Sequence, residues 1–372
     1  MLVMIDKSAS GQVQFSSPDL LPVSLISVPV TDAAALRWAI QQLALGASLD
    51  REATTAAFGV LMRGEASPVQ TAALLMGLRS KGETSDEVAG AVLALRCAMT
   101  RLEAEDPHLL VDTCGTGGGR VGTLNISTAA AFVVAGAGVP VAKHGNRSFT
   151  SRSGSADVME ALGIDIELSP STGLEVLRSV GLTFLFAPVY HPAMRHAGPV
   201  RKELGVPTIM NLLGPMANPA GVVRQVVGVA DAARGKLVAE TLALLGARHA
   251  LVLHAAVGMD EISPSGATLV WEVTDGRVDT WELNPADYGL DCTDLESLAG
   301  GEPRENAARI ERLLAGDANR VVRCAVLLNA AAALYVSASG WSFKEAVERA
   351  TAALDCGAAA QVLARLQKAA PA

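Results

Sequence analysis

From Leu109 onward, short apolar runs alternate with helical segments, and this order limits the possible folds more than any other feature of the chain. The preceding residues 31–103 carry helical signals without a strand signal. Repeated strand-then-helix order is typical of a largely parallel sheet covered by helices on both faces. We therefore predict an α/β protein with a small N-terminal all-helical domain and a larger α/β domain, whose mainly parallel central sheet is flanked by helices.

The domain organisation follows from where these patterns change. Residues 1–30 show no periodicity and are interpreted as an N-terminal extension. Residues 31–105 are predicted to form the small helical domain, which helices near 192–205 are expected to join. The remaining residues 106–372 are predicted to form the α/β domain. At about 150 residues per domain, a chain of 372 residues is long enough for this arrangement.

Turn and capping residues place the individual elements. Two capping boxes, Ser67-Pro68-Val69-Gln70 and Thr84-Ser85-Asp86-Glu87, mark the starts of helices in the N-terminal block. Asp275-Gly276 is typical of a hairpin turn, here within residues 268–283. Further strands are expected at 109–112, 139–143, 164–168, 183–188, 225–230 and 250–254, and helices at about 155–162, up to about 179, and through 194–204.

The composition excludes several classes of function. The net charge of −8 and the pI of about 5.3 argue against a nucleic-acid partner, which requires a broad basic face. Five scattered cysteines without a C-x-x-C pair argue against a disulfide framework or a structural zinc and favour a reducing cytoplasm. The N-terminus does not have the pattern of a signal peptide, and no apolar run is long enough for a membrane span.

Residues 112–157 carry the clearest chemical signal, because they are glycine-rich, hydroxyl-rich and locally basic. Their formal charge is +4 − 2 = +2, inside an acidic chain. The cations are Arg120, Lys143, Arg147 and Arg152, and the anions are Asp112 and Asp157. Such a segment is typical of a site for a small, highly charged anion rather than for a polyanion.

A glycine run between a predicted strand and a predicted helix opens this segment. Gly115, Gly117, Gly118 and Gly119 would allow backbone N–H groups to approach phosphate oxygens at a helix N-terminus. The run matches neither the G-x-G-x-x-G dinucleotide fingerprint nor a Walker A loop. Taken alone, it is also compatible with a flexible turn.

The N-I-S-T block at 125–128 and the K-H-G-N-R block at 143–147 follow. Ser127 and Thr128 could bond a pyrophosphate and leave one hydroxyl for Mg²⁺, although helix capping alone would also explain them. Lys143 could act as a point charge against phosphate. His144 and Asn146 could orient a second substrate, although a single histidine here could also be structural.

Two further candidates lie downstream. Adjacent carboxylates at Asp260 and Glu261 could hold Mg²⁺ together with substrate phosphates, or could simply be solvated in a loop. Arg201 could bind a carboxylate through two parallel hydrogen bonds, or could be a surface residue. Cys114 has no neighbouring base in the sequence, so a nucleophilic role is not expected.

Taken together, these segments resemble the anthranilate phosphoribosyltransferase family, which shares its fold with pyrimidine-nucleoside phosphorylases. Seven motifs occur in order between about residues 31 and 340: GTGG at 115–118, NIST at 125–128, KHGNR at 143–147, SGSADVMEALG at 153–163, FLFAPVYHPAMRHAGPVRKELG at 184–205, NLLGPMANP at 211–219 and DEISP at 260–264. The resemblance implies Mg²⁺-dependent transfer of a phosphoribosyl group from phosphoribosyl pyrophosphate to the amine of anthranilate, a step of tryptophan biosynthesis. It also implies a homodimer joined through the helical domain.

The resemblance also implies roles for individual residues. Arg201 would bind the carboxylate of anthranilate, with Asn146 and Gly115 also at the acceptor, and Ser127, Asp260 and Glu261 would hold Mg²⁺. No dedicated nucleophile is expected, with Lys143 and His144 acting electrostatically. The residues implied to bind the donor are Gly115, Gly118, Gly119, Thr123, Asn125, Ile126, Ser127, Thr128, Lys143, His144, Gly145, Asn146, Arg147, Ser148, Ser151 and Ser155.

The chain departs from the family pattern at two places. Gly119-Arg120 stands where the family usually has Asp, which removes an acceptor near the donor and adds a cation. The approach to Asp260 reads His254-Ala255-Ala256-Val257-Gly258, one residue longer than the usual family pattern, so the loop that carries Asp260 and Glu261 is expected to adopt a different path. The alternative functions are a related transferase or nucleoside phosphorylase with another acceptor, and a non-catalytic sensor of phosphate ligands.

Overall fold

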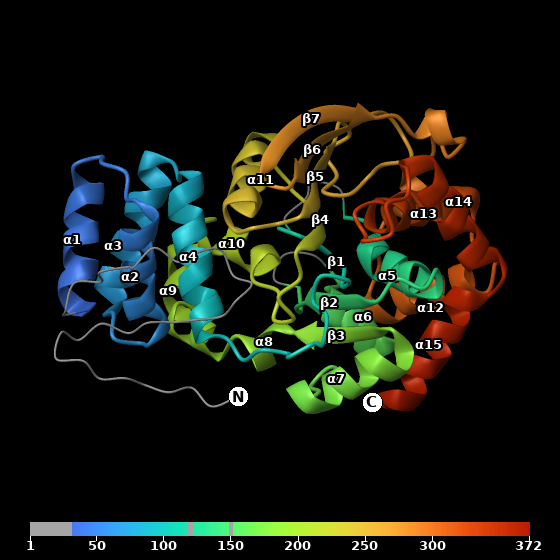
Figure 1. Ribbon diagram of the computed structural model, residues 1–372, viewed down its shortest axis with the longest axis horizontal. Helices are drawn as coiled ribbons and strands as arrows, with labels where there is room; N and C mark the ends of the chain where they lie inside the picture. Colours follow the sequence, from blue (N-terminus) through green and yellow to red (C-terminus); the bar gives the residue numbers. More distant parts are fainter. Residues whose placement is uncertain (1–31, 118–121, 149–151) are drawn as a thin grey trace. The chain divides into compact units, whose positions relative to one another are not determined.

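The computed structural model describes residues 32–117, 122–148 and 152–372. It separates into two compact units (Figure 1). The first contains the described residues up to Ala98 together with Ala193–Met210, and the second contains Met99–Pro192 and Asn211–Ala372. The predicted extension at residues 1–30 lies outside the described residues. The fold class predicted from the sequence, a small helical domain with a larger α/β domain, is confirmed.

The first unit is built from helices in the part of the chain that the structure describes. They are α1 (Asp32–Ala44), α2 (Arg51–Met62), α3 (Pro68–Lys81), α4 (Ser85–Ala98) and α9 (Gly198–Leu204), with a 3₁₀ turn at Pro192–His196 leading toward α9. Both predicted capping boxes are present: the Ser67 hydroxyl accepts from Gln70 N, and Glu87 and Thr84 cap each other. The helix predicted through 194–204 is instead broken, because Gly198-Pro199 begins a new helix at a position where proline needs no N–H partner.

The second unit contains the strands. A five-stranded sheet has the order β1-β4-β5-β6-β7, in which β1, β4 and β5 run parallel and β6 and β7 form the predicted antiparallel hairpin. Strands β2 and β3 form a parallel pair beside it. The strands are β1 (Asp112–Gly115), β2 (Val141–Gly145), β3 (Leu182–Phe186), β4 (Arg224–Gly228), β5 (His249–Ala255), β6 (Thr268–Thr274) and β7 (Arg277–Leu283).

Helices cover both faces of the larger sheet. Figure 1 shows α11 on one side of strands β4 to β6 and α5, α13 and α14 on the other. The almost uniformly apolar α5 is a central helix, since its residues are buried except near Ser127 and the C-terminus. The helices of this unit are α5 (Ile126–Gly136), α6 (Ser155–Ala161), α7 (Pro170–Val180), α8 (Ala187–Tyr190), α10 (Met210–Leu213), α11 (Gly235–Leu244), α12 (Pro303–Leu314), α13 (Arg320–Tyr335), α14 (Phe343–Asp355) and α15 (Ala358–Ala369).

The prediction of a strand at 164–168 is wrong. This segment forms only an isolated bridge between Ile164 and Pro371, with Asp165 N donating to the Ala370 carbonyl at 2.9 Å. Ile164, Ile166 and Leu168 are nevertheless buried. The alternation of apolar and polar residues at 164–168 therefore arises because one side of an extended segment packs against the core, and the segment is not part of a sheet.

Candidate functional site

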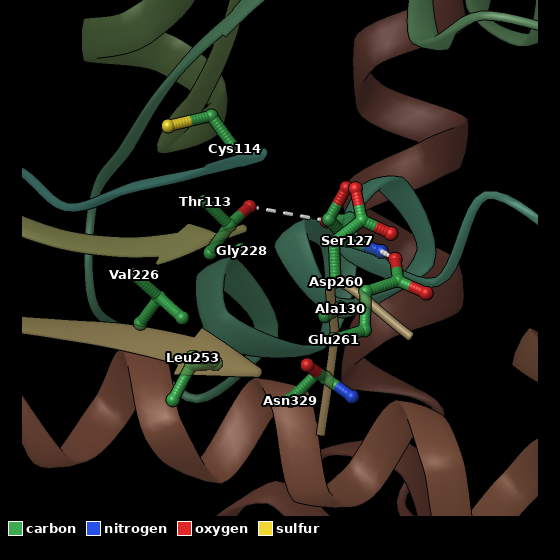
Figure 2. A pocket seen from close by; sticks show the side chains of 10 residues that line it. All are labelled: Thr113, Cys114, Ser127, Ala130, Val226, Gly228, Leu253, Asp260, Glu261 and Asn329. Atoms are coloured by element: carbon green, nitrogen blue, oxygen red, sulfur yellow. Dashed lines mark hydrogen bonds between the residues drawn. The ribbon is translucent and has the colours of Figure 1, made fainter. Parts of the chain in front are cut away.

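The ends of β1, β4 and β5 bring the candidate site together. Parallel strands place their carboxyl ends at one edge of a sheet, where α/β proteins bind ligands. A small cavity of about 10 Å³ lies there, close to the size that holds one water or one small ion. Its lining includes Thr113, Ser127, Asp260 and Glu261 (Figure 2).

Glu261 joins the loop at 256–262, which follows β5, to the start of α5. Its carboxylate accepts hydrogen bonds from the Thr123 hydroxyl at 3.0 Å and from Ser127 N at 3.2 Å. Burial and the neighbouring Asp260 raise the pKa of Glu261 to about 8. Burial also raises the pKa of Asp260. Two adjacent, partly buried carboxyls repel each other when both are ionised, and a divalent cation would relieve this repulsion.

The position of this loop depends on close backbone contacts. A Cβ added at Gly228 would lie 1.6 Å from the Asp260 carbonyl oxygen, so only glycine at the end of β4 permits the loop to approach. The loop turns at Gly258, whose φ is +89°, and Ala255 N donates to the Met259 carbonyl at 3.0 Å. The approach to Asp260 therefore forms a tight turn. Asn329 of α13 secures the far side through two hydrogen bonds to the backbone of Ile262.

Lys143 is the buried cation of the site. Its Nζ donates to the Thr113 carbonyl at 2.6 Å and to the Ser127 hydroxyl at 3.3 Å. Burial lowers the pKa of Lys143, and the negative charge of Asp112 opposes this effect. Because the ammonium sits between β1 and the start of α5, it can support negative charge at the helix N-terminus.

Asp112 and Asn218 brace β1 against β2. The Asp112 carboxylate accepts from His144 N at 3.1 Å and from the Asn218 amide at 2.8 Å, and that amide also donates to the Ala142 carbonyl. Sequence reasoning assigned no site role to Asp112, Thr113 or Asn218. The available signal was a pair of polar residues directly after an apolar run, and the asparagine of the 211–219 motif.

His144 lies beside His191, with ring centroids 4.9 Å apart. His144 Nδ1 is 3.2 Å from the Gly214 carbonyl, whereas its buried Nε2 has no partner among the described residues. Burial lowers the pKa of His144 to about 3 and that of His191 to about 4, so both rings are neutral at pH 7. A neutral imidazole can donate or accept a hydrogen bond with a ligand, depending on its tautomer, but it carries no charge that would attract an anion.

The segment after β2 turns back on α6. Gly145 lets the Ser155 hydroxyl approach, since an added Cβ would be 2.3 Å from that oxygen, and Ser155 donates to the Asn146 carbonyl at 3.4 Å. The Arg147 guanidinium pairs with Glu160 and with Asp157, the latter at 3.2 Å. Asp157 also accepts from Ser148 N and Gly154 N. Arg147 is thus held by α6 and not by the residues around Lys143.

The remaining predicted residues lie in different parts of the chain. Thr128 lies in the first turn of α5 and is fully buried, with no partner found for its hydroxyl among the described residues. Arg201 is on α9 in the helical unit, partly buried, and burial lowers the pKa of its guanidinium. Gly118, Gly119 and Ser151 lie outside the described residues. Burial raises the pKa of the Cys114 thiol well above its ordinary value.

Comparisons with known proteins place this chain in a family. Residues 107–360 match the α/β domain of a glycosyl transferase family, and residues 38–99 match the helical bundle domain of that family. These matches define the class as a two-domain glycosyltransferase. Anthranilate phosphoribosyltransferase of Azorhizobium caulinodans is 47% identical over 89% of this chain and 95% of that protein. The chain therefore belongs to the anthranilate phosphoribosyltransferase family, as the sequence motifs predicted.

Solved structures agree. The anthranilate phosphoribosyltransferase of Thermus thermophilus superimposes with a TM-score of 0.84 at 43% identity, covering 89% of this chain and 98% of that one. The Saccharomyces cerevisiae enzyme in complex with phosphoribosyl pyrophosphate and Mg superimposes with a TM-score of 0.83 at 28% identity, covering 91% and 98%. The same yeast enzyme in complex with 4-fluoroanthranilate gives a TM-score of 0.81.

Proposed function

We propose that this protein transfers the phosphoribosyl group of 5-phosphoribosyl 1-pyrophosphate to the amine of anthranilate, forming N-(5-phosphoribosyl)anthranilate and pyrophosphate in tryptophan biosynthesis. Family membership at 47% identity supports this activity. The observation that carries it furthest is the convergence of Lys143, Ser127 and Glu261 at the N-terminus of α5. That arrangement suits a phosphate-rich ligand together with a divalent cation.

Mg²⁺ is the cofactor of this proposal. Ser127, Asp260 and Glu261 fit it, because their oxygens border a cavity of about 10 Å³ and the two carboxyls lack a full counter-charge. Among the described residues no cluster of three His, Cys, Asp or Glu side chains could hold a metal alone. This is the pattern of Mg²⁺, which typically takes one or two carboxylates together with substrate phosphates. When bound, the ion would neutralise charge on the pyrophosphate.

The proposed mechanism needs little covalent chemistry from the protein. As the anomeric C–O bond breaks, the ribose becomes oxocarbenium-like and negative charge grows on the departing pyrophosphate. Lys143 and the backbone N–H groups near Ser127 would stabilise that charge electrostatically. The arylamine must then only be held in line with the anomeric carbon, which is a positioning effect. In this proposal, the other donor-binding residues implied by the family motifs complete the binding site for phosphoribosyl pyrophosphate, which we call the donor cradle.

The direct test is anthranilate fluorescence, followed while phosphoribosyl pyrophosphate and Mg²⁺ are added. We expect loss of the anthranilate signal and stoichiometric release of pyrophosphate. Phosphorolysis of thymidine or uridine in its place would point to the nucleoside-phosphorylase alternative. Donor binding by calorimetry without any turnover would point to the sensor.

Arg201 is proposed to bind the anthranilate carboxylate, with Asn146 and Gly115 also at the acceptor. Replacing Arg201 by alanine is expected to raise the KM for anthranilate by about 10- to 100-fold, because a charge-assisted bond to a carboxylate is worth roughly 1.5–3 kcal/mol. The KM for the donor should change little. Steady-state kinetics with each substrate varied in turn measures both values, and equal increases would remove Arg201 from this role.

The proposal includes a homodimer joined through the helical domain. Trp38, Leu45, Val69 and Val206 are exposed large apolar side chains of the helical unit, and a partner surface that covered them would remove apolar area from water. Light scattering is expected to give twice the chain mass for the native protein. Trp38→Glu together with Leu45→Glu should shift the measured mass toward that of the monomer, and an unchanged dimer would place the interface elsewhere.

The proposed location is the cytoplasm, which the five free thiols support. No helix among the described residues has the length and hydropathy to cross a membrane.

A further inference from the structure

A chain of side-chain amides connects α12 to the proposed donor cradle. The Asn306 amide nitrogen donates to the Asn125 side-chain oxygen at 2.9 Å, and the Asn125 amide nitrogen donates to the Ser153 carbonyl at 3.1 Å. Asn306 is 1% exposed. These hydrogen bonds therefore link three segments that are far apart in the sequence: the start of α12, the N-terminal end of α5 and the residues that lead into α6.

Asn125 does not act as an ordinary helix cap. It occupies the N-cap position of α5, yet its side chain makes no capping hydrogen bond. Both ends of its amide are engaged with Asn306 and Ser153. If the amide rotated by half a turn, its oxygen would face the Ser153 carbonyl oxygen and its nitrogen would face a donor, so both bonds would be lost. The donor from Asn306 thus fixes the orientation in which Asn125 can hold Ser153.

The same part of the chain also supports the backbone before α5. Leu124 N donates to the Leu298 carbonyl at 2.8 Å, and Thr123 forms an antiparallel bridge with Ala299. Gly301 N in turn donates to the Asn306 side-chain oxygen at 2.9 Å. Asn306 therefore fixes both the segment that lies along Thr123 and the side chain of Asn125. Thr123 itself donates to Glu261, so this support reaches the loop at 256–262.

We propose that Asn306 is a positioning residue for the phosphoribosyl pyrophosphate site, acting through Asn125 to hold the start of α5 and the segment at Ser153 in register. This inference rests on the proposed function for its kinetic consequence. Asn306 does not itself need to touch the donor. Its role is to restrict two cradle segments to one relative arrangement, and small displacements of such groups have large effects on binding and rate.

Asn306→Asp is the most selective variant. The carboxylate keeps an acceptor for Gly301 N but cannot donate to Asn125. We expect the KM for the donor to rise by about 10- to 100-fold, the range for loss of a residue that orients a ligand-binding group. The KM for anthranilate should change far less. Equal changes in both constants, or no change in the donor KM, would overturn the proposal.

Asn319→Ala is the matched control for a general loss of stability. Asn319 caps α13 by accepting from Val322 N at 2.9 Å, so its removal should lower the melting temperature through a helix end. The donor KM should stay at the native value. A comparable rise in donor KM in Asn319→Ala would mean that the kinetic effect of Asn306→Asp reports stability alone.

A double-variant cycle tests the route through Asn125. In an Asn125→Ala background, Asn306→Asp is expected to produce little further change in donor KM, because the connection has already been removed. Full additivity of the two changes would show that Asn306 acts by another route and would sink the inference.

Amide hydrogen exchange separates this inference from the proposed function. In Asn306→Asp without substrates, residues 122–128 and 152–156 should exchange faster than in the native protein, while α14 remains unchanged. Unchanged exchange in those two segments would refute the positioning role even if the enzyme is active. Conversely, the native protein could fail to consume anthranilate while Asn306→Asp still exchanges faster in these two segments. That result would retain the structural role of Asn306 and reject the proposed function.

Discussion

Replacing Lys143 with methionine is expected to lower kcat by about 100- to 1000-fold, the usual effect of removing one group that stabilises developing negative charge. The Lys143 ammonium lies 3.3 Å from the Ser127 hydroxyl at the N-terminus of α5, and the residue is 2% exposed. Methionine keeps much of the volume and removes the charge. Single-turnover measurements at saturating donor isolate the chemical step from donor binding.

A lysine elsewhere provides the control. Lys236 lies on α11 with 75% of its side chain exposed, so Lys236→Met removes the same charge from the protein without altering the candidate site. Its kcat should equal the native value. A native-like kcat in Lys143→Met, with a folded protein by circular dichroism, would exclude the proposed electrostatic role. A loss of donor affinity with unchanged kcat would instead assign Lys143 to ground-state binding.

Replacing Glu261 with glutamine is expected to lower kcat/KM by roughly 100-fold, which corresponds to about 3 kcal/mol of lost metal-dependent stabilisation. The Glu261 carboxylate accepts hydrogen bonds from Thr123 and Ser127 N and lies next to Asp260. An amide of the same shape carries no negative charge for a cation and offers only one acceptor oxygen. The Mg²⁺ concentration for half-maximal activity should therefore rise.

Titration of activity with Mg²⁺ measures this shift, and Glu282→Gln is the control. Glu282 is an exposed residue of β7, so its replacement changes the net charge equally but should leave the Mg²⁺ requirement unaltered. An unchanged Mg²⁺ requirement in Glu261→Gln would remove Glu261 from the metal site and leave Asp260 and Ser127 as candidates.

Local features of the fold were predictable because their causes are local. Ser67-Pro68-Val69-Gln70 forms the expected capping box, and Asp275-Gly276 turns the expected hairpin with φ values of +46° and +83°. The strand predicted at 109–112 is displaced to Asp112–Gly115, because Val111 bridges to Val141 and only the following residues pair with β4. The strand predicted at 164–168 failed because burial of one side of an extended segment produces the same alternation as a sheet.

The sequence by itself determined the order of helices and strands, the chemical types gathered in residues 112–157 and the family to which these motifs belong. Only the tertiary structure decided how those types meet. Glu261 reaches Thr123 across 138 positions, and Asn306 reaches Asn125 across 181. Periodicity and capping depend on neighbours within a few residues, whereas these contacts depend on the strand order β1-β4-β5 and on helices packed against it. Adjacency at the edge of a sheet is a property of the assembled sheet, which is why Asp112, Asn218 and Asn306 emerged only from the structure.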